Sequence, residues 1–221
     1  MPDGIAIDTP VVTDMPSIAT MSYPAFFDAV PPILVHDKLA GLLGASSDGM
    51  LTYHYVDAVR LAGHSCPTVA SAYLMARRAL QVLFPDDVPE RGEIDVSFAK
   101  SLDEGVTGVI ASVIGLITGA AGPGGFKGLG GRFKRQDLLH FDAAIEGEVR
   151  FQRQDNGAAV QLGVELSRVP PNPLSGPLLQ RIMAGTATLA EAHEFAELWQ
   201  ARVKKILIDH ADDPELIVVR A

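Results

Sequence analysis

The stretch from Gly105 to Phe126 contains no charged residue, and this feature constrains the fold more than any other. Its length is close to that of a membrane span, but its apolar part, residues 106–121, is shorter than the roughly 20 residues that a spanning helix needs. Glycines recur along it and would let neighbouring elements pack closely. We therefore predict a buried, glycine-rich helix over residues 104–119, capped by Asp103, in a protein that does not enter the membrane.

The composition of the 221 residues agrees with a folded domain that has a large core. Hydrophobic residues make up 48% of the chain and charged residues 20%, which excludes intrinsic disorder. The balance of 18 Lys and Arg against 27 Asp and Glu gives a net charge of −9, which argues against nucleic acid as a partner. The single cysteine, Cys66, excludes an intramolecular disulfide and a four-cysteine zinc site. No signal sequence is evident at the start of the chain, so we expect a reducing, cytoplasmic location.

Three further helices are predicted from their start signals. Pro67 suits the first position of a helix, where its missing N–H does no harm, and predicts a long helix that runs to about Phe84. Asp37 is a candidate N-cap for a short helix that follows it. Thr188 and Glu191 form a capping box at the start of the last helix. Helical spacing predicts a buried stripe along that last helix, made of Leu189, Ala192, Phe195, Ala196, Trp199, Val203 and Leu207.

Strands are predicted where apolar and polar residues alternate. These segments are residues 94–98, a hairpin with strands over 145–152 and 160–166, and a final strand at 216–219. The mixture of hairpin strands and segregated helices predicts an α+β fold with an antiparallel or mixed sheet. We expect a single domain over residues 1–221, with an extended N-terminal arm (1–22), an α+β core (23–168) and a C-terminal helical extension (174–221).

The turn before Pro67 holds the residues best suited to chemistry. Cys66 falls at the N-cap, where the positive end of the helix dipole favours a thiolate, and His64 lies two residues earlier. One imidazole and one thiolate suit zinc or iron, with His54 and His36 as candidate further ligands. Haem is a second possibility, because a Cys-Pro pair occurs in some haem-binding segments. An inert buried cysteine is the plain alternative, and the residues alone do not decide between them.

A glycine-rich loop, residues 122–131, precedes the basic stretch 132–135. It matches neither the P-loop nor the dinucleotide-binding pattern. Its backbone N–H groups and cations, with Lys127 and Arg132 as the candidate binding residues, could hold a carboxylate or a phosphate. The alternative is a loop whose cations only offset the acidic remainder of the chain.

The run Ala62-Gly63-His64-Ser65-Cys66-Pro67 resembles the His-Gly-His-x-Cys-Pro-Gly signature of the family of proteins like the E subunit of formylmethanofuran dehydrogenase. The resemblance extends over about residues 57–151. It implies an α+β core that forms an intertwined dimer, with His64 and Cys66 at a metal-binding active site. The first histidine of the signature is absent here, and Thr68 stands in place of its last glycine. One cysteine also cannot supply the C-terminal zinc-ribbon-like module that many members carry.

Together these features predict a cytoplasmic, homodimeric protein that binds zinc, iron or another transition metal. We expect it to be an enzyme that acts on a small anionic molecule, with His64 and Cys66 as its catalytic residues. A non-enzymatic metal or haem carrier, or an accessory subunit, is the main alternative. A structural dimer with an inert cysteine is the third.

Overall fold

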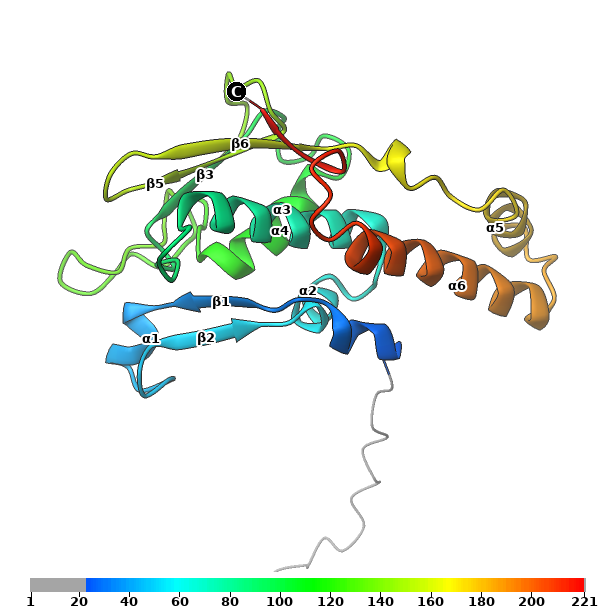
Figure 1. Ribbon diagram of the computed structural model, residues 1–221, viewed down its shortest axis with the longest axis horizontal. Helices are drawn as coiled ribbons and strands as arrows, with labels where there is room; N and C mark the ends of the chain where they lie inside the picture. Colours follow the sequence, from blue (N-terminus) through cyan, green and yellow to red (C-terminus); the bar gives the residue numbers. More distant parts are fainter. Residues whose placement is uncertain (1–22, 221) are drawn as a thin grey trace, which may run out of the picture.

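The computed structural model describes residues 23–220, and the predicted N-terminal arm lies outside these residues. The described chain forms three layers, with a helical layer between a five-stranded sheet and a two-stranded hairpin (Figure 1). The helical layer consists of α3 (Pro67–Leu83) and α4 (Thr107–Thr118). The hairpin consists of β1 (Ile33–His36) and β2 (Met50–Tyr53), which pair antiparallel.

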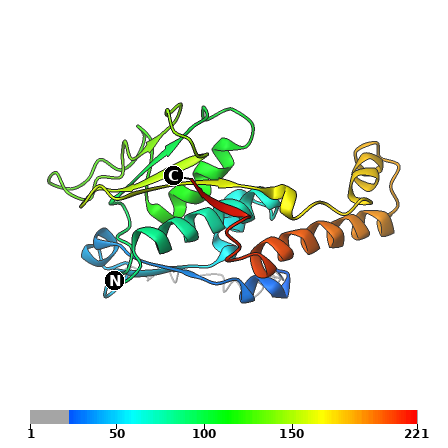
Figure 2. The ribbon, with the colours of Figure 1, turned by 45° about the horizontal axis from the view of Figure 1, so that its top comes forward.

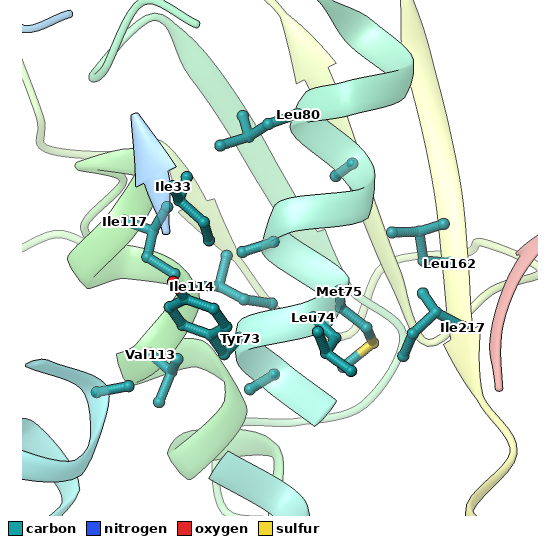
Figure 3. Close-up of a cluster of buried hydrophobic side chains, with 14 of the residues drawn as sticks. Ile33, Tyr73, Leu74, Met75, Leu80, Val113, Ile114, Ile117, Leu162 and Ile217 are labelled. Atoms are coloured by element: carbon teal, nitrogen blue, oxygen red, sulfur yellow. The ribbon is translucent and has the colours of Figure 1, made fainter. Parts of the chain in front are cut away.

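The long helix α3 begins at Pro67 as predicted and is buried on most of its surface, because both other layers cover it. In Figure 3, Tyr73 lies on the side of α4 near Ile114, whereas Met75 lies on the side of the sheet, near Leu162. The Tyr73 hydroxyl lies 3.0 Å from the carbonyl oxygens of both Pro31 and Tyr53, and its one proton is shared between these two acceptors. The phenol thereby joins α3 to the hairpin.

The five-stranded sheet has the order β4-β3-β5-β6-β7. Strands β3 and β4 are parallel and the other neighbours are antiparallel, so the mixed sheet and the predicted α+β class are confirmed. The last strand, β7, pairs with β6, and this pairing brings the end of the chain back to the core. The strands are β3 (Ile94–Phe98), β4 (Leu139–His140), β5 (Val149–Arg153), β6 (Ala159–Val164) and β7 (Ile217–Arg220).

The apolar helix α4 is buried as predicted, but it begins at Thr107 and not at residue 104. Gly105 has a φ of +60°, in the left-handed region, so a right-handed helix cannot pass through it. The Asp103 carboxylate accepts a hydrogen bond from the Ser101 hydroxyl at 2.8 Å instead of capping the helix. Within residues 23–220, no helix has both the length and the apolar character needed to cross a membrane.

The first strand of the predicted hairpin is shorter than the sequence pattern suggested, because β5 begins at Val149. The backbone N–H groups of Glu146 and Gly147 donate to the side-chain oxygen of Gln161, at 2.8 and 3.1 Å. Strand β2 and the short strand β4 were not predicted. The remaining short elements are η1 (Ala25–Ala29), α1 (Lys38–Leu42), α2 (Tyr55–Ala62) and η2 (Leu166–Arg168).

The C-terminal helices are α5 (Ser175–Met183) and α6 (Leu189–Lys204), and α6 continues into a π-helical turn, Lys205–Asp209. The capping box of Thr188 and Glu191 is confirmed. The buried stripe is confirmed only near the end of the helix, where Val203 and Leu207 are fully buried. Its first half is wrong, since Leu189 is 92% exposed. Both views show why: α5 and the first half of α6 project away from the three layers (Figures 1 and 2).

Candidate functional site

The turn that carries His64 and Cys66 comprises residues 63–66 and lies between the end of α2 and the start of α3. We call it the Cys66 turn. Gly63 ends α2 with a φ of +75°, and its N–H donates to the carbonyl of Val59 at 2.8 Å. This left-handed conformation favours glycine and ends the helix. The side chains of residues 64–66 therefore follow a sharp bend and lead directly into the first turn of α3.

Cys66 is the N-cap of α3, as predicted. Its backbone is extended, with φ −149° and ψ 168°, and its sulfur accepts a hydrogen bond from the N–H of Val69 at 3.5 Å. Only 8% of the residue is exposed, and it is the single free cysteine of the chain. The sulfur thus lies at the N-terminus of a 17-residue helix, at the end of the turn that carries His64.

His64 is exposed and has one of its two ring nitrogens engaged. Its Nδ1 lies 2.9 Å from the carbonyl oxygen of Ala62. A carbonyl can only accept, so the proton of the neutral ring is on Nδ1 and the lone pair is on Nε2. Holding one nitrogen against a backbone carbonyl is the usual arrangement of a metal-binding histidine.

Ser65, between these two residues, is held by side chains from α2 and α6. The Tyr55 hydroxyl lies 3.0 Å from the Ser65 hydroxyl, which donates to the side-chain oxygen of Gln200 at 3.0 Å. Burial raises the pKa of Tyr55, so its phenol stays protonated. Trp199 Nε1 and Gln200 Nε2 both donate to the Ser65 carbonyl, each at 3.1 Å. Sequence reasoning missed these contacts, because the partners are 134 and 135 residues away and no local pattern connects them.

His54 and His36, the other two predicted ligands, do not join His64 and Cys66 in a metal centre. His54 precedes α2, where its backbone N–H donates to Asp57 at 2.9 Å. His36 lies at the end of β1 and pairs with Glu90, with 2.9 Å between Nδ1 and the carboxylate. Within residues 23–220 no group of three or more His, Cys, Asp or Glu side chains is placed to hold a metal ion.

The turn therefore supplies donors of the right kind but too few of them. An imidazole and a thiolate suit zinc or iron, whereas zinc sites use at least three protein ligands. His64 and Cys66 are two, so one chain does not make a complete centre within the residues that the structure describes.

The glycine-rich loop places its cations in two different settings. Lys127 and Arg132 are exposed, and the Arg132 guanidinium lies 5.0 Å from the centre of the Phe133 ring. A cavity of about 570 Å³ opens beside the loop, lined by Lys134 and Arg135 and not by Lys127 or Arg132. Five carboxylates also line this cavity, from Glu90, Glu93, Asp95, Asp137 and Asp155.

Arg135 belongs to an ionic group that we call the Asp37 cluster, in which Asp37 and Arg135 are buried and Arg91 is half-buried. Asp37 caps α1 through the N–H groups of Leu39 and Ala40, as predicted. Its carboxylate also accepts from Arg91 at 2.8 Å and from Arg135 at 2.7 Å. Burial raises the pKa of Asp37, but the hydrogen bonds and the two guanidinium charges outweigh it and hold the pKa below its usual value.

Comparison with known proteins gives one family. The family model described as "FmdE, Molybdenum formylmethanofuran dehydrogenase operon" matches residues 61–213. The match begins just before the Cys66 turn and includes the glycine-rich loop and α6. No curated protein matches the chain.

Proposed function

Because the chain belongs to the FmdE family, we propose that it is a transition-metal-binding protein whose ligands include His64 and Cys66. The observation that carries this proposal is the turn itself. It presents a thiol at a helix N-terminus and, two residues earlier, an imidazole whose Nε2 has no hydrogen-bond partner among residues 23–220. Zinc and iron are the ions that this donor pair favours, with haem as the less favoured alternative.

We further propose that the missing ligands come from outside the single chain, in a homodimer. The exposed apolar side chains of the projecting helices support this, since Met183 is 78% exposed and Leu189 is 92% exposed. The projecting α5 and first half of α6 would give a second chain a surface to cover. A small anionic molecule, bound near Lys127 and Arg132, remains our proposal for the ligand of the complete site.

The test is the metal content of protein purified without a polyhistidine tag. We expect about one equivalent of zinc or iron per chain, as in a mononuclear site. Cys66→Ala and His64→Ala should each lose it, and the matched control His193→Ala, which changes an exposed histidine of α6, should keep it. Absence of metal in the native protein, even after reconstitution with zinc and iron, would overturn the proposal.

An enzyme and a carrier differ in whether a coordination position is open. Cobalt(II) can replace zinc and has a visible spectrum that depends on its ligands. If the protein is an enzyme, added azide should change the spectrum of the cobalt form by binding at the open position. An unchanged spectrum at saturating azide would favour the alternative function, a metal carrier or accessory subunit.

A further inference from the structure

The Ser65 carbonyl accepts two hydrogen bonds from one helix, and this unites the Cys66 turn with a distant part of the chain. Trp199 Nε1 and Gln200 Nε2 are the donors, each at 3.1 Å. A carbonyl oxygen has two lone pairs, so both are used. The Gln200 amide makes a second bond to the same residue, because its oxygen accepts from the Ser65 hydroxyl at 3.0 Å.

These bonds fix the peptide group that precedes Cys66. The plane of the Ser65–Cys66 peptide and the backbone angles of Cys66 together set the direction of the thiol. In the observed conformation the sulfur accepts from the N–H of Val69. Only 8% of Cys66 is exposed in this conformation, so rotation of the peptide, which moves the sulfur away from the end of α3, would open the thiol to reagents in solution.

We propose that Trp199 and Gln200 are positioning residues, through which α6 holds the His64-Ser65-Cys66 turn in the conformation that presents the thiol at the end of α3. The importance of this inference for activity rests on the proposed function. The inference itself concerns the turn, and it holds whether or not a metal is bound there.

The same helix contains a matched control. Arg202 lies within one turn of Trp199, and its Nε donates to the carbonyl of Val169 at 2.7 Å. Replacement of Arg202 therefore removes hydrogen bonds from α6 to Val169 and Leu166, so it loosens the contact between α6 and the body of the protein, as replacement of Trp199 does, but on a different segment of the chain. A general loosening of α6 would follow from either change, whereas loss of positioning would follow only from changes at Trp199 and Gln200.

The experiment measures the rate at which a thiol reagent labels Cys66 in the metal-free protein. The chain has one cysteine, so the whole signal comes from the turn. We expect Trp199→Phe, which keeps an aromatic ring but loses the N–H, to raise the rate about fivefold, as loss of one neutral hydrogen bond would. Gln200→Ala, which loses two bonds, should raise it about tenfold or more. Gln200→Glu keeps an acceptor for the Ser65 hydroxyl but sets a carboxylate oxygen against the Ser65 carbonyl, so it should raise the labelling rate at least as much as Trp199→Phe does.

Arg202→Met should label within about twofold of the native rate, even where its urea midpoint falls as far as that of Trp199→Phe. Equal labelling of the native protein, Trp199→Phe and Gln200→Glu would overturn the proposal, and so would equal acceleration in Arg202→Met. Metal analysis of the same variants separates the two proposals. Accelerated labelling in a protein that binds no metal would support the positioning role while removing the proposed function.

Discussion

The Asp37 cluster and the Cys66 turn each contain the N-cap of a helix, but they differ in how many of their polar side-chain atoms have hydrogen-bond partners. The Asp37 carboxylate accepts two backbone N–H groups and two guanidinium groups, and all of these partners belong to the chain. In the Cys66 turn the side chain of Gln200 holds Ser65, whereas the Nε2 of His64 has no hydrogen-bond partner in the part of the chain that the structure describes. The comparison assigns the first cluster a structural role, whereas the second is the place where we propose that a metal binds.

The largest difference between the two regions should appear in the free energy of unfolding of their variants. Asp37→Ala leaves two guanidinium groups without their shared carboxylate, and truncating one member of a buried charged group costs about 3–5 kcal/mol. Urea unfolding would measure the loss, with Asp86→Ala, an exposed acidic residue, as the matched control. A loss below about 1 kcal/mol would mean that the cluster is not the structural element that we infer.

The second difference should appear in the pH dependence of stability. The pKa of Asp37 is lower in the folded protein than its usual value of 3.8. Its contribution is therefore complete above that usual value and is lost as the pH falls below it, through the folded pKa. Urea midpoints measured from pH 6 to pH 3 should fall more steeply for the native protein than for Asp37→Ala. Parallel profiles would contradict the assignment.

At the Cys66 turn we expect a much smaller change in stability. Serine is a better N-cap than most residues, so Cys66→Ser should alter the free energy of unfolding by no more than about 1 kcal/mol. Urea unfolding of the metal-free variant would measure it. If Cys66→Ser destabilises the protein as much as Asp37→Ala does, the cysteine is retained for packing, and the contrast between the two regions disappears.

The smallest effect is expected at His64. The side chain is exposed, and its one hydrogen bond is to the carbonyl of Ala62, so His64→Ala should change the free energy of unfolding by less than about 0.5 kcal/mol. Thermal or urea unfolding of the metal-free protein would measure this. A larger loss would assign the imidazole a structural role and weaken its assignment as a ligand.

Local signals predicted much of this molecule. The helix starts at Pro67 and Thr188 and the N-caps at Cys66 and Asp37 depend on neighbours within a few residues, and all are confirmed. The exception at Asp103 arose because Gly105 adopts a left-handed conformation that its neighbours do not specify.

Contacts between distant segments could not be predicted from spacing. Arg91 and Arg135 reach Asp37 from 54 and 98 residues away, and α6 reaches Ser65 from still farther. The periodicity of α6 correctly gave an apolar face, but a period does not reveal what covers that face. This is why Val203 is buried and Leu189 is not.

Because Trp199 donates a hydrogen bond to the Ser65 carbonyl, its intrinsic fluorescence can report on the Cys66 turn. Trp199 is the only tryptophan of the chain, so the indole fluorescence comes from one position, adjacent to the Cys66 turn. Rotation of the Ser65 peptide would remove the hydrogen bond to the indole and shift the emission. A paramagnetic ion bound by the turn would quench the same signal. Ligand binding, movement of the turn and unfolding can therefore be followed in the native sequence, without an attached dye.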